Sequence, residues 1–167
     1  MYRVIISGIG VEIPPASIAN EELVESFNRW VEAENEKRAE RGEAPLQKSD
    51  SGFIVHASGI RKRHVYEREG ILDPARMAPR IPARADDELS VQAEFGIASA
   101  RKALAHAGRR PADIDMVICS SSHLQRAYPA IAIEMQQALG TAGAGFDMGL
   151  DCSSAVAALH VAAKLVR

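Results

Sequence analysis

Apolar side chains gather in short uninterrupted runs at four places in this chain, and such runs predict strands. Residues 2–9 form a nearly continuous β-branched run, closed by nearby glycines and prolines, which is typical of a buried strand. Apolar runs at residues 116–119 and 143–147 predict two further strands, and residues 53–55 predict a short strand or turn.

Elsewhere, apolar side chains recur at intervals of three and four residues, which predicts helices. Asn20 is expected to cap the first helix, and Ser90 is expected to cap a second, which Gly108 ends. A third helix covers residues 131–139, and a fourth carries Cys152 in its first turn. Helices and strands that alternate in this way indicate an α/β sheet.

The first predicted helix continues into a segment of almost pure charge at residues 32–41, with Gly42 as a suitable stop. Glu34 and Arg38 stand four residues apart and are expected to pair. Because such segments are most often solvated faces, we expect a solvated extension, an exposed face with no partner. Residues 69–87 contain three prolines and no sustained period, which predicts a long surface loop.

Composition limits the classes of function. A length of 167 residues with 47% hydrophobic residues suits a single domain with a sizeable core. The 20 basic and 22 acidic side chains give a net charge of -2 without a basic, aromatic-rich stripe, which argues against a nucleic-acid partner. No secretory leader is evident and no apolar run approaches the ~20 residues of a membrane span. We therefore expect a cytoplasmic protein.

The candidate chemistry centres on Cys152, at the start of an alanine-rich helix. Gly149 and Asp151 suit a sharp turn just before it. At a helix start, unpaired backbone N–H groups and the positive end of the helix dipole favour a thiolate over a thiol and can hold an oxyanion. Cys152 is therefore the candidate nucleophile. The alternative is an inert cysteine packed among small residues.

Other motifs are weaker. Gly8 and Gly10 suggest a dinucleotide fingerprint, but its third glycine would fall on Ile13. Cys119 and His123 have the spacing of a metal pair, yet the chain has only two cysteines and no further ligand clusters nearby, so we predict no metal site. Cys119 is more simply a buried packing residue of its strand.

Several short motifs lie in order along the chain: residues 5–10 (IISGIG), residues 20–23 (NEEL), residues 58–64 (SGIRKRH), Tyr128-Pro129 with residues 136–140 (QQALG), and Phe146-Asp147 leading to Cys152. This ordered set, from about Arg3 to Arg167, resembles the N-terminal half of β-ketoacyl-acyl-carrier-protein synthase III, a condensing enzyme of the thiolase-like superfamily. The resemblance implies an α/β fold with a mixed β-sheet, half of a five-layered αβαβα sandwich. It also implies that residues 1–167 are one N-terminal thiolase-like domain and that the C-terminal half is absent.

The resemblance further implies an acyltransferase of fatty-acid synthesis that forms a carbon–carbon bond by decarboxylative Claisen condensation. Cys152 matches the family's nucleophile and would carry the acyl group, and malonyl on acyl carrier protein would supply the attacking carbanion. The substrates would be coenzyme A or acyl carrier protein thioesters, with no cofactor, in a homodimer. The family's charge-stabilising His and Asn lie in the C-terminal half, so the 167-residue chain alone is expected to be inactive.

Two further residues would contact substrate by resemblance. Phe53 stands where well-known members place a Trp that stacks on the coenzyme A adenine, and Ala57 replaces an Arg, so weaker stacking is expected. Tyr128 matches an aromatic residue at the dimer contact that reaches toward the neighbouring acyl pocket. The long segments at residues 34–50 and 69–87 suggest a branch that takes a longer or unusual acyl group.

Two alternatives remain open at the level of the sequence. The chain can be a non-catalytic subunit or inactive fragment of a condensing complex, or it can be a cysteine hydrolase or acyl-transfer module. Ser153 and Ser154 stand where the family pattern has Ala and Gly, a further departure that suggests a branch with a longer or unusual acyl group.

Overall fold

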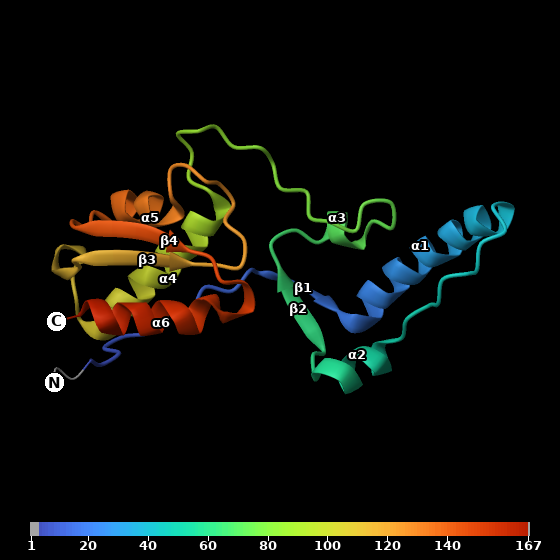
Figure 1. Cartoon of the computed structure of the whole chain (residues 1–167), viewed down its shortest axis with the longest axis horizontal. Helices are drawn as coiled ribbons and strands as arrows, with labels where there is room; N and C mark the ends of the chain where they lie inside the picture. Colours follow the sequence, from blue (N-terminus) through green and yellow to red (C-terminus); the bar gives the residue numbers. More distant parts are fainter. Residues whose placement is uncertain (1–3, 167) are drawn as a thin grey trace. The chain divides into compact units, whose positions relative to one another are not determined.

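The computed structural model describes residues 4–166, which form two compact units. The first unit contains residues 4–12 and 84–166, and the second contains Ile13–Ala83. Each unit builds its own two-stranded sheet, as Figure 1 shows. We describe the units separately.

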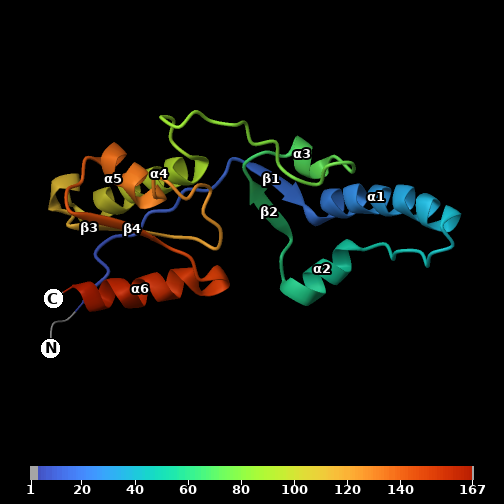
Figure 2. The ribbon, with the colours of Figure 1, turned by 45° about the horizontal axis from the view of Figure 1, so that its top comes forward.

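The first unit has three layers. Strands β3 and β4 pair in parallel, with Met116 opposite Ala144 and Ser120 opposite Met148. Helices α4 and α5 lie on one face of this sheet and α6 lies on the other (Figures 1 and 2). The bounds of its elements are α4 Val91–Ala107, 3-10 helix η1 Pro111–Asp113, β3 Met116–Ser120, α5 Ile131–Leu139, β4 Ala144–Met148, 3-10 helix η2 Asp151–Ser153 and α6 Ser154–Leu165.

Apolar side chains of α4, α5 and β3 form the core of this unit. Its buried members are Ala93, Ile97, Val117, Ile131, Ala132 and Met135. The helix ends follow the predicted capping residues: the Ser90 hydroxyl accepts the N–H of Ala93 at 3.1 Å, and Gly108 and Gly140 end α4 and α5 with φ of 62° and 71°. The predicted helices and strands of this unit between Ser90 and Gly140 are confirmed.

The predicted strand at residues 2–9 is wrong for residues 4–9; residues 2 and 3 lie outside the described range. Val4, Ile5, Ile6 and Ile9 are 45–76% exposed, and this segment has no strand in the structure. A β-branched run becomes a strand only where a second strand completes its hydrogen bonds. Here the segment passes α4 instead, and a Cβ at Gly10 would lie 2.5 Å from the backbone nitrogen of Ala103.

The second unit places three helices around an antiparallel strand pair. Ala16 of β1 lies opposite Val65 of β2. The apolar face of α1 includes the fully buried Val31, and the rings of Phe27 and Trp30 lie 5.7 Å apart. The bounds are β1 Ala16–Ala19, α1 Asn20–Glu40, α2 Ser51–Ser58, β2 Lys62–Val65 and α3 Glu69–Leu72.

Asn20 does not cap α1, as the sequence predicted, but is its first residue, after the N-cap Ala19. Its buried side chain joins the strand pair instead: Nδ2 donates to the Ile60 carbonyl at 2.6 Å, and Oδ1 accepts from Arg63 at 2.9 Å. The Glu22 carboxylate accepts the Ala19 N–H at 3.0 Å, which supplies the capping bond. Tertiary contacts therefore override the local preference of asparagine for a cap.

The predicted strand or turn at residues 53–55 is also wrong, because these residues lie in helix α2. The Asp50 carboxylate accepts the Phe53 N–H at 2.7 Å and caps the helix, and Gly59 ends it with φ of 71°. An apolar run of three residues cannot distinguish a strand from one helical turn, whereas these two flanking residues do.

Most residues of the charged extension of α1 are exposed, as expected for a solvated face. Another segment of the chain also contacts the helix. Residues 43–50 return along the helix, and Asn35 and Asn28 hold them by binding both the N–H and the carbonyl of Leu46 and Ser49, at 2.7–3.0 Å. The two asparagines are two helical turns apart and so share one face. Gly42 ends the helix as predicted.

Glu34 pairs with Arg41 at 3.1 Å rather than with Arg38, which pairs with Glu43 at 3.0 Å. The returning segment supplies Glu43, so the expected i,i+4 pair gives way to pairs across the bend. The predicted loop at residues 69–87 begins with the short helix α3, and its described remainder has no helix or strand.

A single carboxylate organises the start of that loop. Glu67 accepts the N–H groups of Gly70 at 2.9 Å and Arg80 at 2.6 Å. These backbone hydrogen bonds, first that from Arg80, lower the pKa of Glu67 to about 2.

Candidate active site

Cys152 lies in the 3-10 turn η2, which leads directly into α6. Its thiol is free and the residue is exposed. The α-helix begins at Ser154, so Cys152 precedes it by two residues instead of lying within its first α-helical turn as predicted. The alternative that Cys152 is an inert packing residue is wrong for this chain, because that role requires a buried side chain and Cys152 is exposed.

A network of serines holds the turn that presents Cys152. Asp151 has φ of 45°, in the left-handed region that Asp tolerates better than most residues. Its carbonyl accepts from Ser122 Oγ at 3.1 Å and lies 2.8 Å from Ser154 Oγ. The Ser154 hydroxyl also accepts the N–H of Leu150 at 2.8 Å and is 96% buried, since its exposure is 4%. The strained residue is thus fixed on both sides.

Not every backbone N–H group of the turn is bonded within it. The N–H of Ser153 donates to the Leu150 carbonyl at 3.0 Å, and that of Ser154 donates to the Asp151 carbonyl. Within the described residues, the N–H of Cys152 itself has no hydrogen-bond acceptor. This N–H can therefore donate to an oxyanion formed at the sulfur.

The loop that follows β3 contacts this turn. Because β3 and β4 are parallel, the connections that leave their C-terminal ends lie at the same edge of the sheet, as Figure 1 shows. Ser121 donates its N–H to the Met148 carbonyl at 3.1 Å, and its own carbonyl lies 3.2 Å from Ser154 Oγ. Ligand sites of α/β sheets form at such edges.

The same loop carries Tyr128, which is 91% exposed and precedes Pro129 through a cis peptide bond. The structure therefore brings the Tyr128 loop and the Cys152 turn together within the first unit. Phe53 belongs to the second unit, where it lies on α2 and is 63% exposed.

Asp147 joins β4 to the start of α5. Its carboxylate accepts the N–H groups of Ile131 and Ala132, both at 2.8 Å. The side chain therefore satisfies two N–H groups that the helix cannot bond internally. It fixes the end of the Tyr128 loop to the strand that leads to Cys152.

Cys119 is the second cysteine of this unit and lies on β3, where it packs against the core as predicted, although it is only half-buried. Burial, followed by the negative charges of Asp147 and Glu134, raises the pKa of Cys119 to about 11. The group therefore stays a neutral thiol near neutral pH. Within residues 4–166, no three His, Cys, Asp or Glu side chains form a group that can hold a metal ion.

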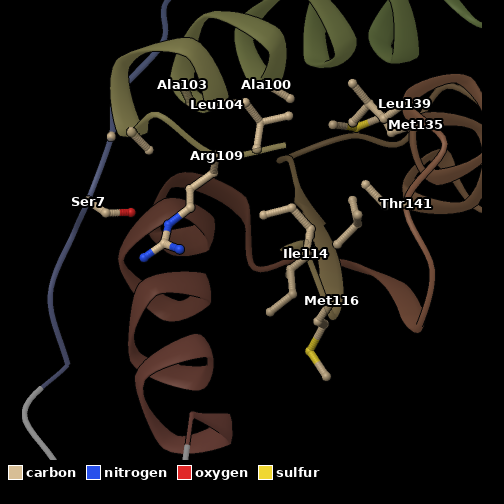
Figure 3. A pocket seen from close by; sticks show the side chains of 14 residues that line it. Ser7, Ala100, Ala103, Leu104, Arg109, Ile114, Met116, Met135, Leu139 and Thr141 are labelled. Carbon is tan, nitrogen blue, oxygen red and sulfur yellow. The ribbon is translucent and has the colours of Figure 1, made fainter. Parts of the chain in front are cut away.

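A cavity of about 320 Å³ lies among residues of α4, β3 and α5 (Figure 3). Leu104, Ile114, Met135 and Leu139 surround it, and the side chains of Ser7, Arg109 and Thr141 are polar members of its lining. Neither Cys152 nor Tyr128 is among the described residues that line it. This hollow is therefore separate from the candidate nucleophile.

Sequence reasoning missed the residues that hold the site. Ser122 and Ser154 bond the Cys152 turn, and Gln92 bonds residues 121, 123 and 125 of the loop after β3. The sequence did mark Ser154 in one respect, because Ser153 and Ser154 stand where the family pattern has Ala and Gly. Gln92 and Ser122 act through contacts between distant segments, which have no local signature.

Among the described residues, no helix is both long enough and apolar enough to cross a membrane.

Comparison with known proteins gives a consistent group of relatives, although no family model matches the chain. The chain is 50% identical over 148 residues to a β-ketodecanoyl-[acyl-carrier-protein] synthase of Pseudomonas aeruginosa, which covers 86% of this chain and 42% of that protein. It is 30% identical over 171 residues to a β-ketoacyl-[acyl-carrier-protein] synthase III of Brucella anthropi, covering 100% of this chain and 40% of that protein. The chain thus spans about two fifths of the length of these relatives.

Solved structures agree on the fold. The priming β-ketosynthase of the R1128 polyketide pathway superposes with a TM-score of 0.65 at 25% identity, over 96% of this chain and 36% of that one. The 3-oxoacyl-[acyl-carrier-protein] synthase III of Aquifex aeolicus superposes with a TM-score of 0.66 at 18% identity, over 96% and 39%. The described residues therefore have the α/β architecture of the N-terminal part of these thiolase-fold proteins.

Proposed function

Because the chain belongs to the β-ketoacyl-[acyl-carrier-protein] synthase III family, whose N-terminal part it covers, we propose that the protein is a condensing acyltransferase with Cys152 as nucleophile. The observation that carries this proposal is the exposed thiol in a turn held by hydrogen bonds at the C-terminal edge of β3 and β4. An acyl thioester can approach such a thiol, whereas the half-buried Cys119 keeps its proton.

The proposed reaction has two steps. The Cys152 thiolate attacks the carbonyl carbon of an acyl thioester, so a new sulfur–carbon bond forms, the old one breaks, and the released thiol takes up a proton. Malonyl on acyl carrier protein then loses carbon dioxide. The electron pair of the broken carbon–carbon bond attacks the acyl carbonyl carbon, the Cys152 thiolate leaves, and a β-ketoacyl product remains on the carrier protein.

The chain's own residues suit the first step. The turn presents the sulfur, and the unpaired N–H of Cys152 can stabilise the oxyanion of the tetrahedral intermediate. The thiolate and the malonyl carboxylate supply the nucleophile and the electron pair, so the reaction requires no cofactor. The charge-stabilising His and Asn implied by the resemblance would come from the length of the relatives that this chain does not span, and the 167 residues alone are then inactive.

The substrate proposal follows the relative that is half identical to this chain. Its name specifies a β-ketodecanoyl product, and condensation with malonyl adds two carbons, so its acyl donor is a medium-length group. We extend this preference to the present protein. Phe53 would contact the coenzyme A part of the donor and Tyr128 the acyl chain, in the cytoplasmic homodimer that the resemblance implies.

The test is a condensation assay on a polypeptide that spans the full length of the relatives. Octanoyl-coenzyme A and malonyl-acyl carrier protein are supplied together, and β-ketoacyl-acyl carrier protein and carbon dioxide are measured. The proposal predicts equal amounts of both products. Hydrolysis of the octanoyl thioester without formation of a β-ketoacyl product would support the cysteine hydrolase alternative instead.

A further inference from the structure

Gln92, the second residue of α4, makes four hydrogen bonds to the loop that follows β3. Its Nε2 group donates to the His123 carbonyl at 2.5 Å and to Ser121 Oγ at 3.3 Å. Its Oε1 accepts the N–H of Gln125 at 2.6 Å, and its own N–H donates to Gln125 Oε1 at 3.2 Å. The side-chain amide of Gln92 thus donates two hydrogen bonds through Nε2 and accepts one through Oε1, all with the same loop.

This segment connects the two parts of the candidate site. At its beginning, Ser121 and Ser122 bind the turn that carries Cys152, through Ser154 and Asp151. At its end lies Arg126, two residues before Tyr128. The Gln92 contacts fall between these two anchors, at residues 121, 123 and 125.

Arg126 fixes the far end of the segment less firmly than Gln92 fixes its middle. Its Nε lies 3.7 Å from the buried Glu134 carboxylate, and its Nη1 lies 3.5 Å from the Asp86 carbonyl. Both distances are at the long limit for such contacts, whereas two of the Gln92 contacts are 2.6 Å or shorter. Residues 121–130 contain no helix or strand, so these side-chain bonds supply the order.

We infer that Gln92 is a positioning residue that sets where Tyr128 lies relative to Cys152, and that it thereby influences which acyl chains the site accepts. The inference rests on the proposed function for its consequence in catalysis, but its structural part does not. Helix α4 has a separate cap in Ser90, whose hydroxyl accepts the Ala93 N–H. Removal of the Gln92 amide should therefore loosen the loop and leave the helix intact.

The structural part is tested by amide hydrogen exchange of the full-length protein. Gln92→Ala and Gln92→Met are compared with Gln137→Ala, a matched control whose exposed glutamine side chain makes no hydrogen bond among the described residues. Gln92→Met keeps the length of the side chain and removes its hydrogen-bonding groups. We expect exchange in residues 121–127 to rise roughly tenfold in both Gln92 variants, as the loss of one or two hydrogen bonds implies, with α4 unchanged.

Unchanged exchange in Gln92→Ala, or wild-type exchange in Gln92→Met, would overturn the positioning role, because the second result would assign the effect to packing. The catalytic part is the ratio of kcat/KM for two acyl-coenzyme A substrates that differ by several carbons. We expect this ratio to change roughly three- to tenfold in both Gln92 variants and to stay constant in Gln137→Ala.

A loosened loop with an unchanged ratio would remove Gln92 from substrate selection. Failure of the proposed function is recognised separately, because the wild-type protein would then form no β-ketoacyl product at all, whereas the exchange experiment would still report on the loop.

Discussion

Two cysteines lie in the same small unit of this protein, and their surroundings differ: one is half-buried and the other is exposed. Cys119 points from β3 into a half-buried position next to the carboxylates of Asp147 and Glu134, and its pKa rises to about 11. Cys152 lies exposed in a hydrogen-bonded turn at the edge of the same sheet. Burial and nearby negative charge disfavour the thiolate of Cys119, whereas the sulfur of Cys152 is open to an approaching substrate.

The accessibility of each sulfur therefore distinguishes the two cysteines and makes Cys152 the candidate nucleophile. Cys119 lies near the end of β3, and Cys152 lies just beyond β4, the parallel partner of β3. The difference arises because two residues, Gly149 and Leu150, separate β4 from the turn η2, which carries the second thiol out of the sheet.

The largest effect is expected from replacing the two cysteines in the full-length protein. Cys152→Ala should lower condensing activity by several orders of magnitude, because the covalent step requires its sulfur. Cys119→Ala should retain most of the activity. Steady-state assays of both variants, with circular dichroism to confirm folding, make the comparison. Comparable losses of condensing activity in the two folded variants would contradict the difference proposed between Cys152 and Cys119.

Alkylation of Cys119 should be slow and strongly pH-dependent. With a pKa near 11 in place of the ordinary 9.0, its thiolate fraction is about a hundredfold lower than that of an exposed thiol at the same pH. Labelling with iodoacetamide in the Cys152→Ala background should therefore accelerate until the pH approaches 11. Rapid labelling at pH 7 would show that the thiol is not protected by burial.

The same shift affects stability with a definite sign. The raised pKa means that the native state holds the thiol proton more tightly than the unfolded chain, so its contribution is complete below pH 9 and is lost as the pH rises toward 11. Chemical denaturation of the wild type and of Cys119→Ala across this range checks the sign. The alanine variant should lose less stability than the wild type over the same interval.

Tyr128→Ala tests whether the loop that is hydrogen-bonded to the Cys152 turn limits the length of the acyl chain that the site accepts. Removal of the aromatic ring should shift preference toward longer acyl groups by roughly one to two orders of magnitude, since each methylene contact contributes ~1 kcal/mol or more. The readout is the ratio of kcat/KM for two acyl thioesters of different length, at a concentration where sizing shows a dimer. A constant ratio in an intact dimer would exclude Tyr128 from the acyl pocket.

A smaller effect is expected from Ser154→Ala, which removes the buried hydroxyl between the Cys152 turn and the loop after β3. The loss of its hydrogen bonds to Leu150 and either Asp151 or Ser121 should destabilise the fold by ~1–3 kcal/mol. Ser153→Ala is the matched control, because that hydroxyl is exposed and bonds only the Leu150 carbonyl. Urea denaturation should give a lower free energy of unfolding for Ser154→Ala than for Ser153→Ala.

Much of the first unit could be predicted from the sequence, because local residues mark where its helices and strands begin and end. Ser90, Gly108 and Gly140 mark helix ends by local hydrogen bonds and backbone conformation, and short apolar runs mark β3 and β4. Cys152 could be found for a similar reason, since the glycine and aspartate before it signal a turn.

The sequence misled where the outcome depends on distant partners. Residues 4–9 have the composition of a strand but form none, with Gly8 close to α4. Asn20 could have capped a helix but bonds Ile60 and Arg63 instead. Gln92 gave no signal at all, because its four bonds reach residues about thirty positions away. The support of the candidate site, unlike its nucleophile, is therefore visible only in three dimensions.

The central claim, that Cys152 is the acyl carrier, is tested most directly by locating the acyl group. The full-length protein is incubated with octanoyl-coenzyme A without malonyl-acyl carrier protein, digested at low pH, and its peptides are weighed by mass spectrometry. We predict one octanoyl group on the peptide that contains Cys152, and none after Cys152→Ala. An octanoyl group on Cys119, or one that persists in the Cys152→Ala variant, would contradict the account.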